Sequence, residues 1–156
     1  MSERPAPRRR RRRRVVWALG TVLVVVVAIQ FVPYGWTHSN PPVTADAPWP
    51  DEQVAAIARE SCYSCHSNET EWPLYSYVAP MSWLVRSDVE SGRDELNFST
   101  WPDDDGELDD SIEQIEEGTM PPSQYTLIHR GAALSDAEQT ELIAALREME
   151  RAGERD

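Results

Sequence analysis

The sequence has little of what forms cross-links or binds metals: its 156 residues include two cysteines and three histidines. A disulfide between Cys62 and Cys65 would close so short a loop that it would hardly constrain the unfolded chain. A zinc site needs four ligands, and only His38, His66 and His129 could complete one. Alternating apolar and polar runs and internal repeats are also absent, which argues against a β-sheet fold or a repeat fold.

Lysine is absent altogether, and the arginines are unevenly distributed. The formal net charge is −12, from 27 acidic residues and 15 arginines. Residues 1–14 contain eight arginines and one acidic residue, a net of +7, which leaves seven arginines and 26 acidic residues, a net of −19, in the remainder. A basic tail joined to an acidic domain indicates two separate roles. We expect the tail to set orientation at a membrane, and we do not expect binding to nucleic acid.

An uncharged stretch, VVWALGTVLVVVVAIQFV, follows the tail at residues 15–32. Its 18 residues are just enough for a helix to cross a bilayer, and they exceed the apolar core of about 7–15 residues in cleaved signal peptides. The sequence therefore predicts a single-pass transmembrane signal anchor in the cytoplasmic membrane, with the N terminus inside and the following domain outside or periplasmic. Residues 33–48, rich in proline and small polar residues, predict an extended linker.

The rest of the chain, residues 49–152, predicts a small all-α domain. Helices are expected at about residues 50–65, after Pro80, at 109–118 and after Ser135. Ser135 and Glu138 form a capping-box pattern, and Gly118 suits the end of a helix. The apolar faces of these helices are narrow and the loops between them are long. A domain with so small a core usually needs a disulfide, a metal or a cofactor to complete it.

The five residues CYSCH at 62–66 have the C-x-x-C-H spacing of covalent haem attachment. Cysteines three positions apart on one helix face can each add to a vinyl group of a porphyrin, and the histidine that follows can bind the iron. The pattern predicts haem c attached through Cys62 and Cys65, with His66 as the proximal ligand. A redox dithiol is a weaker alternative, because that motif usually follows a strand; half of a zinc site is the other.

Four side chains are candidates for the other face of the iron: Met120, His129, Met81 and His38. Met120 lies in EEGTMPPSQY, where the following proline disfavours a helical conformation. A methionine held in such a loop can reach over a haem, so we predict that the iron is bound by His66 and Met120. His129 is the second candidate, and it could instead bind a haem propionate. A third alternative leaves the distal site open.

The stretch CYSCHSNETEWPLYSYVAPMSWLV, residues 62–85, resembles the small haem-binding domain family of bacterial membrane-anchored, cytochrome c-like proteins. The later segments GTMPPSQY and LIHRGAALSDAE resemble its second block. The resemblance covers about residues 49–146, and the acidic stretch at 103–110 departs from it. It implies a cytochrome c-like fold, haem on both cysteines, and His66 and Met120 as the axial ligands.

These observations favour an electron carrier over an enzyme. We expect a membrane-anchored monohaem c-type cytochrome whose redox partner the sequence does not identify. A haem-based sensor or ligand-binding domain with an exchangeable distal site is the alternative. A peroxidase would need an open site and a distal acid–base pair, and the sequence does not indicate such a pair.

Overall fold

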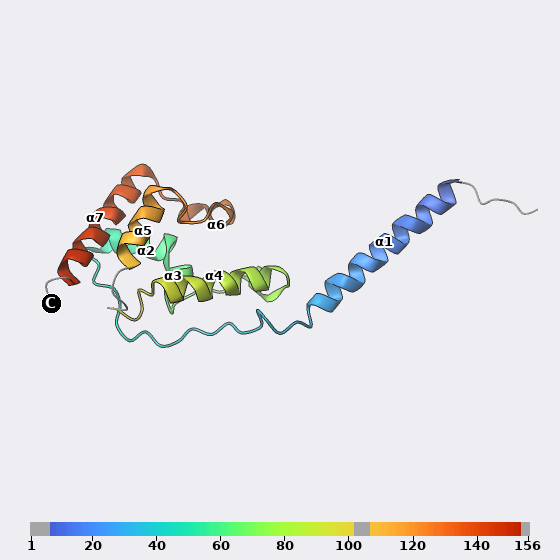
Figure 1. Ribbon diagram of the computed structural model, residues 1–156, viewed down its shortest axis with the longest axis horizontal. Coiled ribbons are helices and arrows are strands. Elements are labelled where there is room, and N and C mark those ends of the chain that lie inside the picture. The colour runs from blue at the N-terminus through green and yellow to red at the C-terminus, as the bar shows by residue number, and fades with distance from the viewer. Residues whose placement is uncertain (1–6, 102–106, 154–156) are drawn as a thin grey trace, which may run out of the picture. The chain divides into compact units, whose positions relative to one another are not determined.

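The computed structural model describes residues 7–101 and 107–153, which form helices and loops without a β-strand among them (Figure 1). The helices are α1 (Pro7–Ile29), α2 (Glu52–Ser61), α3 (Tyr63–His66), α4 (Met81–Glu95), α5 (Glu107–Glu116), α6 (Ser123–Ile128) and α7 (Asp136–Gly153), with short 3-10 helices η1 (Leu74–Tyr77) and η2 (Arg130–Ala132). The predicted all-α fold is confirmed. The first six residues of the basic tail and part of the acidic stretch at 103–110 lie outside the described residues.

The chain divides into two compact units. The first unit consists of Met1–Thr37 and Pro73–Arg86, and the second consists of His38–Trp72 and Ser87–Asp156. Both cysteines belong to the second unit. The domain limits expected from the sequence, 49–152, stay a prediction.

Helix α1 of the first unit begins among arginines and ends at Ile29. The apolar run continues to residue 32, but residues 30–32 form a turn, with each backbone N–H bonded three residues back. Only residues 15–29 of the run are therefore helical, about 22 Å at 1.5 Å per residue. Among the described residues no helix is both long enough and apolar enough to cross a membrane, so the structure does not support the transmembrane helix predicted over 15–32.

After α1 the chain folds back onto the segment 73–86 of the same unit. The Gln30 side chain donates from Nε2 to the carbonyl oxygen of Ala79 at 3.0 Å, and its Oε1 accepts the Ala79 N–H at 2.9 Å. Gly35 has a positive φ of 88°, and a Cβ there would lie 2.8 Å from the Ser82 carbonyl oxygen. The chain can therefore turn against Ser82 only with glycine at this position.

In the second unit, α2, α5 and α7 pack around the main hydrophobic core. Leu142 and Leu146 of α7 are fully buried in it, and Phe98 joins from the segment after α4. The N terminus of α2 is capped by Asp51, whose carboxylate accepts the N–H groups of Gln53 and Val54 at 2.9 and 3.0 Å. The capping box predicted at the last helix is present: the Ser135 N–H donates to a Glu138 carboxylate oxygen at 2.8 Å.

The second part of the predicted linker is bound to the second unit. The backbone N–H of Thr44 donates to the Ser99 carbonyl oxygen at 3.0 Å, and that of Ala47 donates to Phe98 at 2.9 Å. Trp101 donates back to Ala45 at 3.0 Å. This segment therefore belongs to the folded unit and is no free tether.

Candidate functional site

A largely apolar cavity of about 250 Å³ lies within the second unit. Its wall is formed by α3, the end of α2, and residues of α4, α5, α6 and α7. The four predicted site residues, Cys62, Cys65, His66 and Met120, all line it. The structure therefore brings together side chains that are up to 58 positions apart in the sequence.

Cys62 lies at the break between α2 and α3, and Cys65 lies in α3. Cys62 ends α2 with φ −120° and ψ −40°, and its N–H still donates to Ala58 at 2.8 Å. The next turn begins there, because the His66 N–H donates to the Cys62 carbonyl oxygen at 2.9 Å. Burial raises the pKa of Cys62 to about 12 and that of Cys65 to about 11, so both thiols are protonated at neutral pH.

The ring of His66 is oriented by the backbone of α4 and of the residue that follows it. Its Nδ1 lies 3.1 Å from the carbonyl oxygen of Leu96. A carbonyl oxygen can only accept, so Nδ1 carries the proton and Nε2 keeps its lone pair. Burial lowers the pKa of His66, which favours the neutral ring that a metal requires. This is the arrangement in which a histidine binds a metal through Nε2 while its other nitrogen is fixed by a hydrogen bond.

Met120 lies in the loop between α5 and α6, and α5 holds that loop. The backbone N–H groups of Thr119 and Met120 both donate to the Gln114 carbonyl oxygen, at 3.0 and 3.2 Å. Pro121 and Pro122 continue along the cavity wall. The Met120 side chain therefore lies at the cavity wall, in a short loop that is hydrogen-bonded to α5.

The other candidates for the distal face do not line the cavity. His129 stacks on Tyr125 with ring centroids 4.4 Å apart, and His38 packs edge-on against Trp72 at 4.8 Å. Met81 belongs to the first unit. Within the part of the chain that the structure describes, no group of three or more histidine, cysteine or acidic residues could hold a metal ion, so the zinc alternative gains no support.

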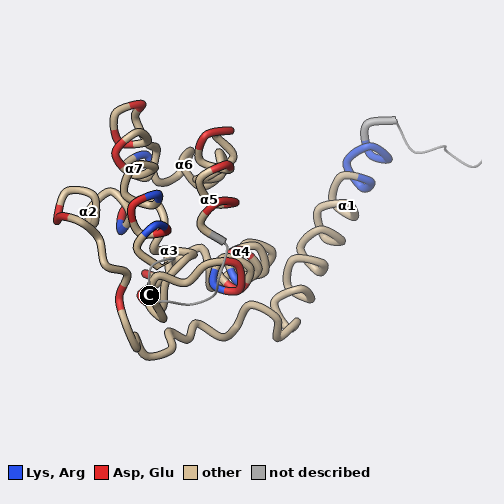
Figure 2. The backbone as a smooth tube through the Cα atoms, turned by 60° about the vertical axis from the view of Figure 1, so that its left-hand side comes forward, with Lys and Arg blue, Asp and Glu red and all other residues tan. Residues whose placement is uncertain are grey.

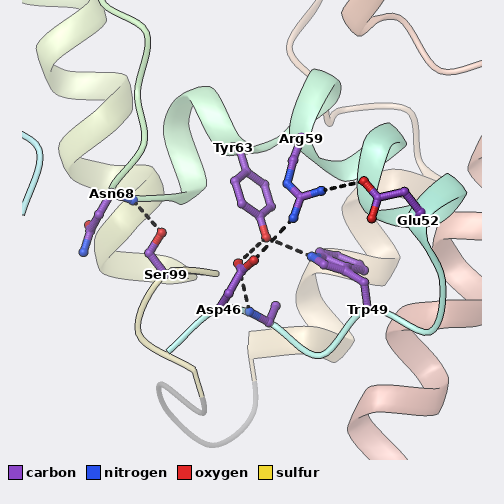
Figure 3. A network of polar contacts seen from close by, with 8 residues as sticks. Asp46, Trp49, Glu52, Arg59, Tyr63, Asn68 and Ser99 are labelled. Atoms are coloured by element: carbon purple, nitrogen blue, oxygen red, sulfur yellow. Dashed lines mark hydrogen bonds and ion pairs between the residues drawn. The ribbon is translucent and has the colours of Figure 1, made fainter. Parts of the chain in front are cut away.

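A network of polar contacts holds Tyr63, the residue that follows the first cysteine of the motif (Figure 3). Tyr63, between the two cysteines, is buried and donates its hydroxyl to Asp46 at 2.7 Å, while the Trp49 indole donates to the Tyr63 oxygen at 2.8 Å. Arg59 lies 3.5 Å from the same carboxylate. The Tyr63 ring stacks on Phe98 at 5.5 Å. Tyr63 thus anchors the motif in the core while its neighbours face the cavity.

Sequence reasoning missed two residues of α4 that fix the motif. Arg93 donates from Nε to the Ser67 carbonyl oxygen at 2.7 Å and from Nη2 to Thr70 Oγ1 at 2.9 Å. At Gly92 an added Cβ would lie 2.8 Å from the Cys65 carbonyl oxygen. Neither carries a local signal, because both act on residues more than 20 positions earlier in the sequence.

The side chains at this cavity fit a haem. Two thiols three positions apart match the two vinyl groups, and an imidazole with a bare Nε2 and a thioether match an iron. The apolar wall suits a porphyrin. A model of the haem-binding domain matches residues 24–148. The chain belongs to the haem-binding domain family. The family predicted from the sequence is confirmed, and with it a haem cofactor.

Among curated proteins this family member is similar to cytochrome c peroxidase Ccp of Escherichia coli (strain K12). The two are 27% identical over 143 residues, which is 83% of this chain. The chain spans 31% of the length of that relative, so the activity of the whole peroxidase does not transfer with the similarity. No solved structure matches the chain.

Proposed function

We propose that this haem-binding domain is a monohaem c-type cytochrome with a cytochrome c-like fold that carries electrons. The observation that supports it best is the meeting of Cys62, Cys65, His66 and Met120 on one apolar cavity. Each thiol would form one thioether, His66 would bind iron through Nε2, and Met120 would bind through its sulfur. Haem held in this way supplies a one-electron iron couple.

In this proposal the chain's own backbone fixes the two residues that would bind the iron. The Leu96 carbonyl fixes the His66 ring, and the Gln114 carbonyl fixes the Met120 loop. If His66 and Met120 both held the iron, they would leave no position on it for a substrate, which would favour electron transfer over catalysis. A methionine ligand gives a higher reduction potential than a second histidine would.

Covalent attachment is tested by making the chain in cells that mature c-type cytochromes and staining a denaturing gel for haem. We expect the stain at the position of the wild-type chain and none for the paired Cys62→Ser, Cys65→Ser variant. If acidified acetone extracts the haem from the wild-type chain, the attachment is not covalent and the proposal is wrong.

A peroxidase or ligand-binding function is the second candidate, supported by the similarity to a cytochrome c peroxidase. Asp88, Glu95 and Asp110 also line the cavity and could supply acid–base groups if the distal position were open. Carbon monoxide distinguishes the two functions. With Met120 bound, the reduced protein should bind it very slowly at neutral pH and should not consume hydrogen peroxide. Rapid binding together with peroxide turnover would favour the second candidate.

We propose further that residues 15–32 hold the chain at the cytoplasmic membrane, with the haem domain on its outer side. The large apolar side chains of residues 15–27 are 45–75% exposed, and eight arginines precede them. A helix apolar on all sides is normally covered by lipid or by protein. The full chain should stay in the membrane fraction through carbonate washing, and protease added to spheroplasts should degrade the domain. Release by carbonate, or protection from protease, would contradict this location.

A further inference from the structure

The first unit carries exposed apolar and aromatic side chains on two segments that are distant in sequence. They are Phe31, Val32, Tyr34, Trp36, Leu74, Tyr77, Val78 and Leu84, called here the apolar patch. Leu74 is 89% exposed and Phe31 is 74% exposed. Single exposed apolar residues are common, but a group of this size on one unit usually marks a binding surface.

The patch continues from the end of α1, because its two segments are joined within the unit. Gln30 bonds both backbone groups of Ala79, next to Val78. Gly35 lies against Ser82. These contacts hold the residues that follow α1 against those that start α4, so whatever covers the apolar helix is also next to the patch.

The charges indicate which kind of surface the patch meets. The first unit contains nine arginines and one acidic residue, a net of +8, whereas the second contains six arginines and 26 acidic residues, a net of −20. Residues 73–86 include Arg86 and no acidic residue. Figure 2 shows arginines at the start of α1 and acidic residues along α2, α5 and α7. Eight of these nine arginines precede the apolar helix and lie on its inner side in the proposed topology, so Arg86 is the charge of the first unit that favours an anionic surface beside the patch, while such a surface repels the acidic second unit.

We infer that the apolar patch lies in the headgroup region of an anionic bilayer. Leucine and valine side chains would enter the acyl boundary, while Tyr34, Trp36 and Tyr77 suit the interface, where an aromatic ring meets lipid and a polar tip meets water. Arg86, whose guanidinium lies 5.4 Å from the Tyr34 ring centroid, adds a positive charge beside the patch. The inference rests on the proposed membrane location and adds a second site of lipid contact.

Photolabelling of the full haem-loaded chain tests this inference. The chain is placed in vesicles of equal parts phosphatidylcholine and phosphatidylglycerol, with a trace of phosphatidylglycerol that carries a diazirine near the headgroup end of its acyl chain. After illumination, mass spectrometry locates the labelled peptides. We expect label in residues 15–32 and in residues 74–84.

In the double variant Leu74→Glu, Val78→Glu, the amount of label in residues 74–84 should fall about fivefold, and the label in residues 15–32 should stay the same. Its haem spectrum should be unchanged, because both side chains are exposed. The matched control is Leu127→Glu, since Leu127 is 76% exposed but belongs to α6 in the second unit. It should label like the wild type.

The outcomes separate the two proposals. Label confined to residues 15–32 in the wild type would overturn the inference, leave the membrane location intact and assign the patch to a protein partner. Label in neither segment would overturn the membrane location and the inference together. If the double variant fails to fold, the wild-type labelling pattern alone decides.

Discussion

The hydrogen bond between His66 and the Leu96 carbonyl determines which ring nitrogen is left for iron. Among single residues, this contact and the loop of Met120 matter most to the proposed redox chemistry. The potential of such a centre depends on the identity of its axial ligands and on the groups that fix them. Substitution of one ligand is therefore the sharpest test at this scale.

Met120→His should replace a thioether by an imidazole and lower the reduction potential by on the order of a tenth of a volt or more. The ferric protein should also lose its weak long-wavelength methionine-to-iron absorption. Spectroelectrochemistry measures both changes. Met81→Leu, in the first unit, is the control and should keep the band and the potential. If Met120→His retains the band, another residue is the ligand.

Gly92→Ala should lower the free energy of unfolding by about 1–3 kcal/mol, because the new Cβ would meet the Cys65 carbonyl oxygen at 2.8 Å and the backbone must shift. Urea denaturation followed by circular dichroism measures the change in midpoint. Gly153→Ala in α7 has nothing within 4 Å of the added Cβ and is the control. Equal stability of the two variants would show that α4 does not pack tightly on the motif.

Some of these residues could be identified from the sequence and others could not. The spacing of Cys62, Cys65 and His66 has a direct chemical meaning, so the candidate ligands could be read without a structure. Gly92 and Arg93 could not, because a glycine or an arginine within a helix gives no sign of its partner. Their roles depend on how α4 meets α3, which only tertiary packing determines.

Helix α2 carries the first cysteine at its end, and Asp51 caps its beginning. At the scale of the element, the stability of this helix decides how firmly the motif is held. Its apolar stripe packs on the core, but its first N–H groups depend on the Asp51 carboxylate. Losing that cap should therefore loosen the helix.

Asp51→Ala should cost about 1 kcal/mol of unfolding free energy, since two backbone N–H groups lose their acceptor. Asp51→Asn is the matched control, because asparagine caps helices about as well. Thermal melts of the haem-loaded proteins measure both. A loss of the same size in both variants would indicate that the charge of Asp51, and not its capping bonds, is what stabilises α2.

Long periodic elements were the most predictable. The helices after Pro80 and Ser135 are found as α4 and α7, and Gly118 has the positive φ of 70° expected of a helix stop. The first predicted helix is broken at Cys62, and α6 was not predicted, because a helix of six residues has too few turns to show a period. The end of α1 was misjudged because apolar character continues past the turn at Gln30.

The cavity of about 250 Å³ lies beside the core of the second unit and shares Leu142 and Leu146 with it. At the scale of the whole molecule, folding and cofactor binding are therefore linked. Haem bound there would remove this apolar wall from water, which would stabilise the folded unit by on the order of several kcal/mol. The free energy of unfolding of a whole domain is typically about 5–15 kcal/mol, so this contribution is a large part of it.

The chain produced without cytochrome maturation should therefore melt at a much lower temperature and without a sharp transition. Circular dichroism at increasing temperature, compared with the haem-loaded chain, measures the difference. The paired Cys62→Ser, Cys65→Ser variant made with the maturation machinery should behave like the apoprotein. An apoprotein that melts as sharply and as high as the loaded one would show that the cofactor does not complete the core.

The net charge of −20 on the second unit would also affect how fast the proposed electron carrier exchanges electrons with its partners. Two bodies of opposite charge collide more often than neutral ones, and bodies of like charge collide less often. A basic donor should thus react faster at low ionic strength than at physiological salt, where charges are screened over about 8 Å. Stopped-flow rates across a salt series would then separate basic partners from acidic ones before any partner is identified.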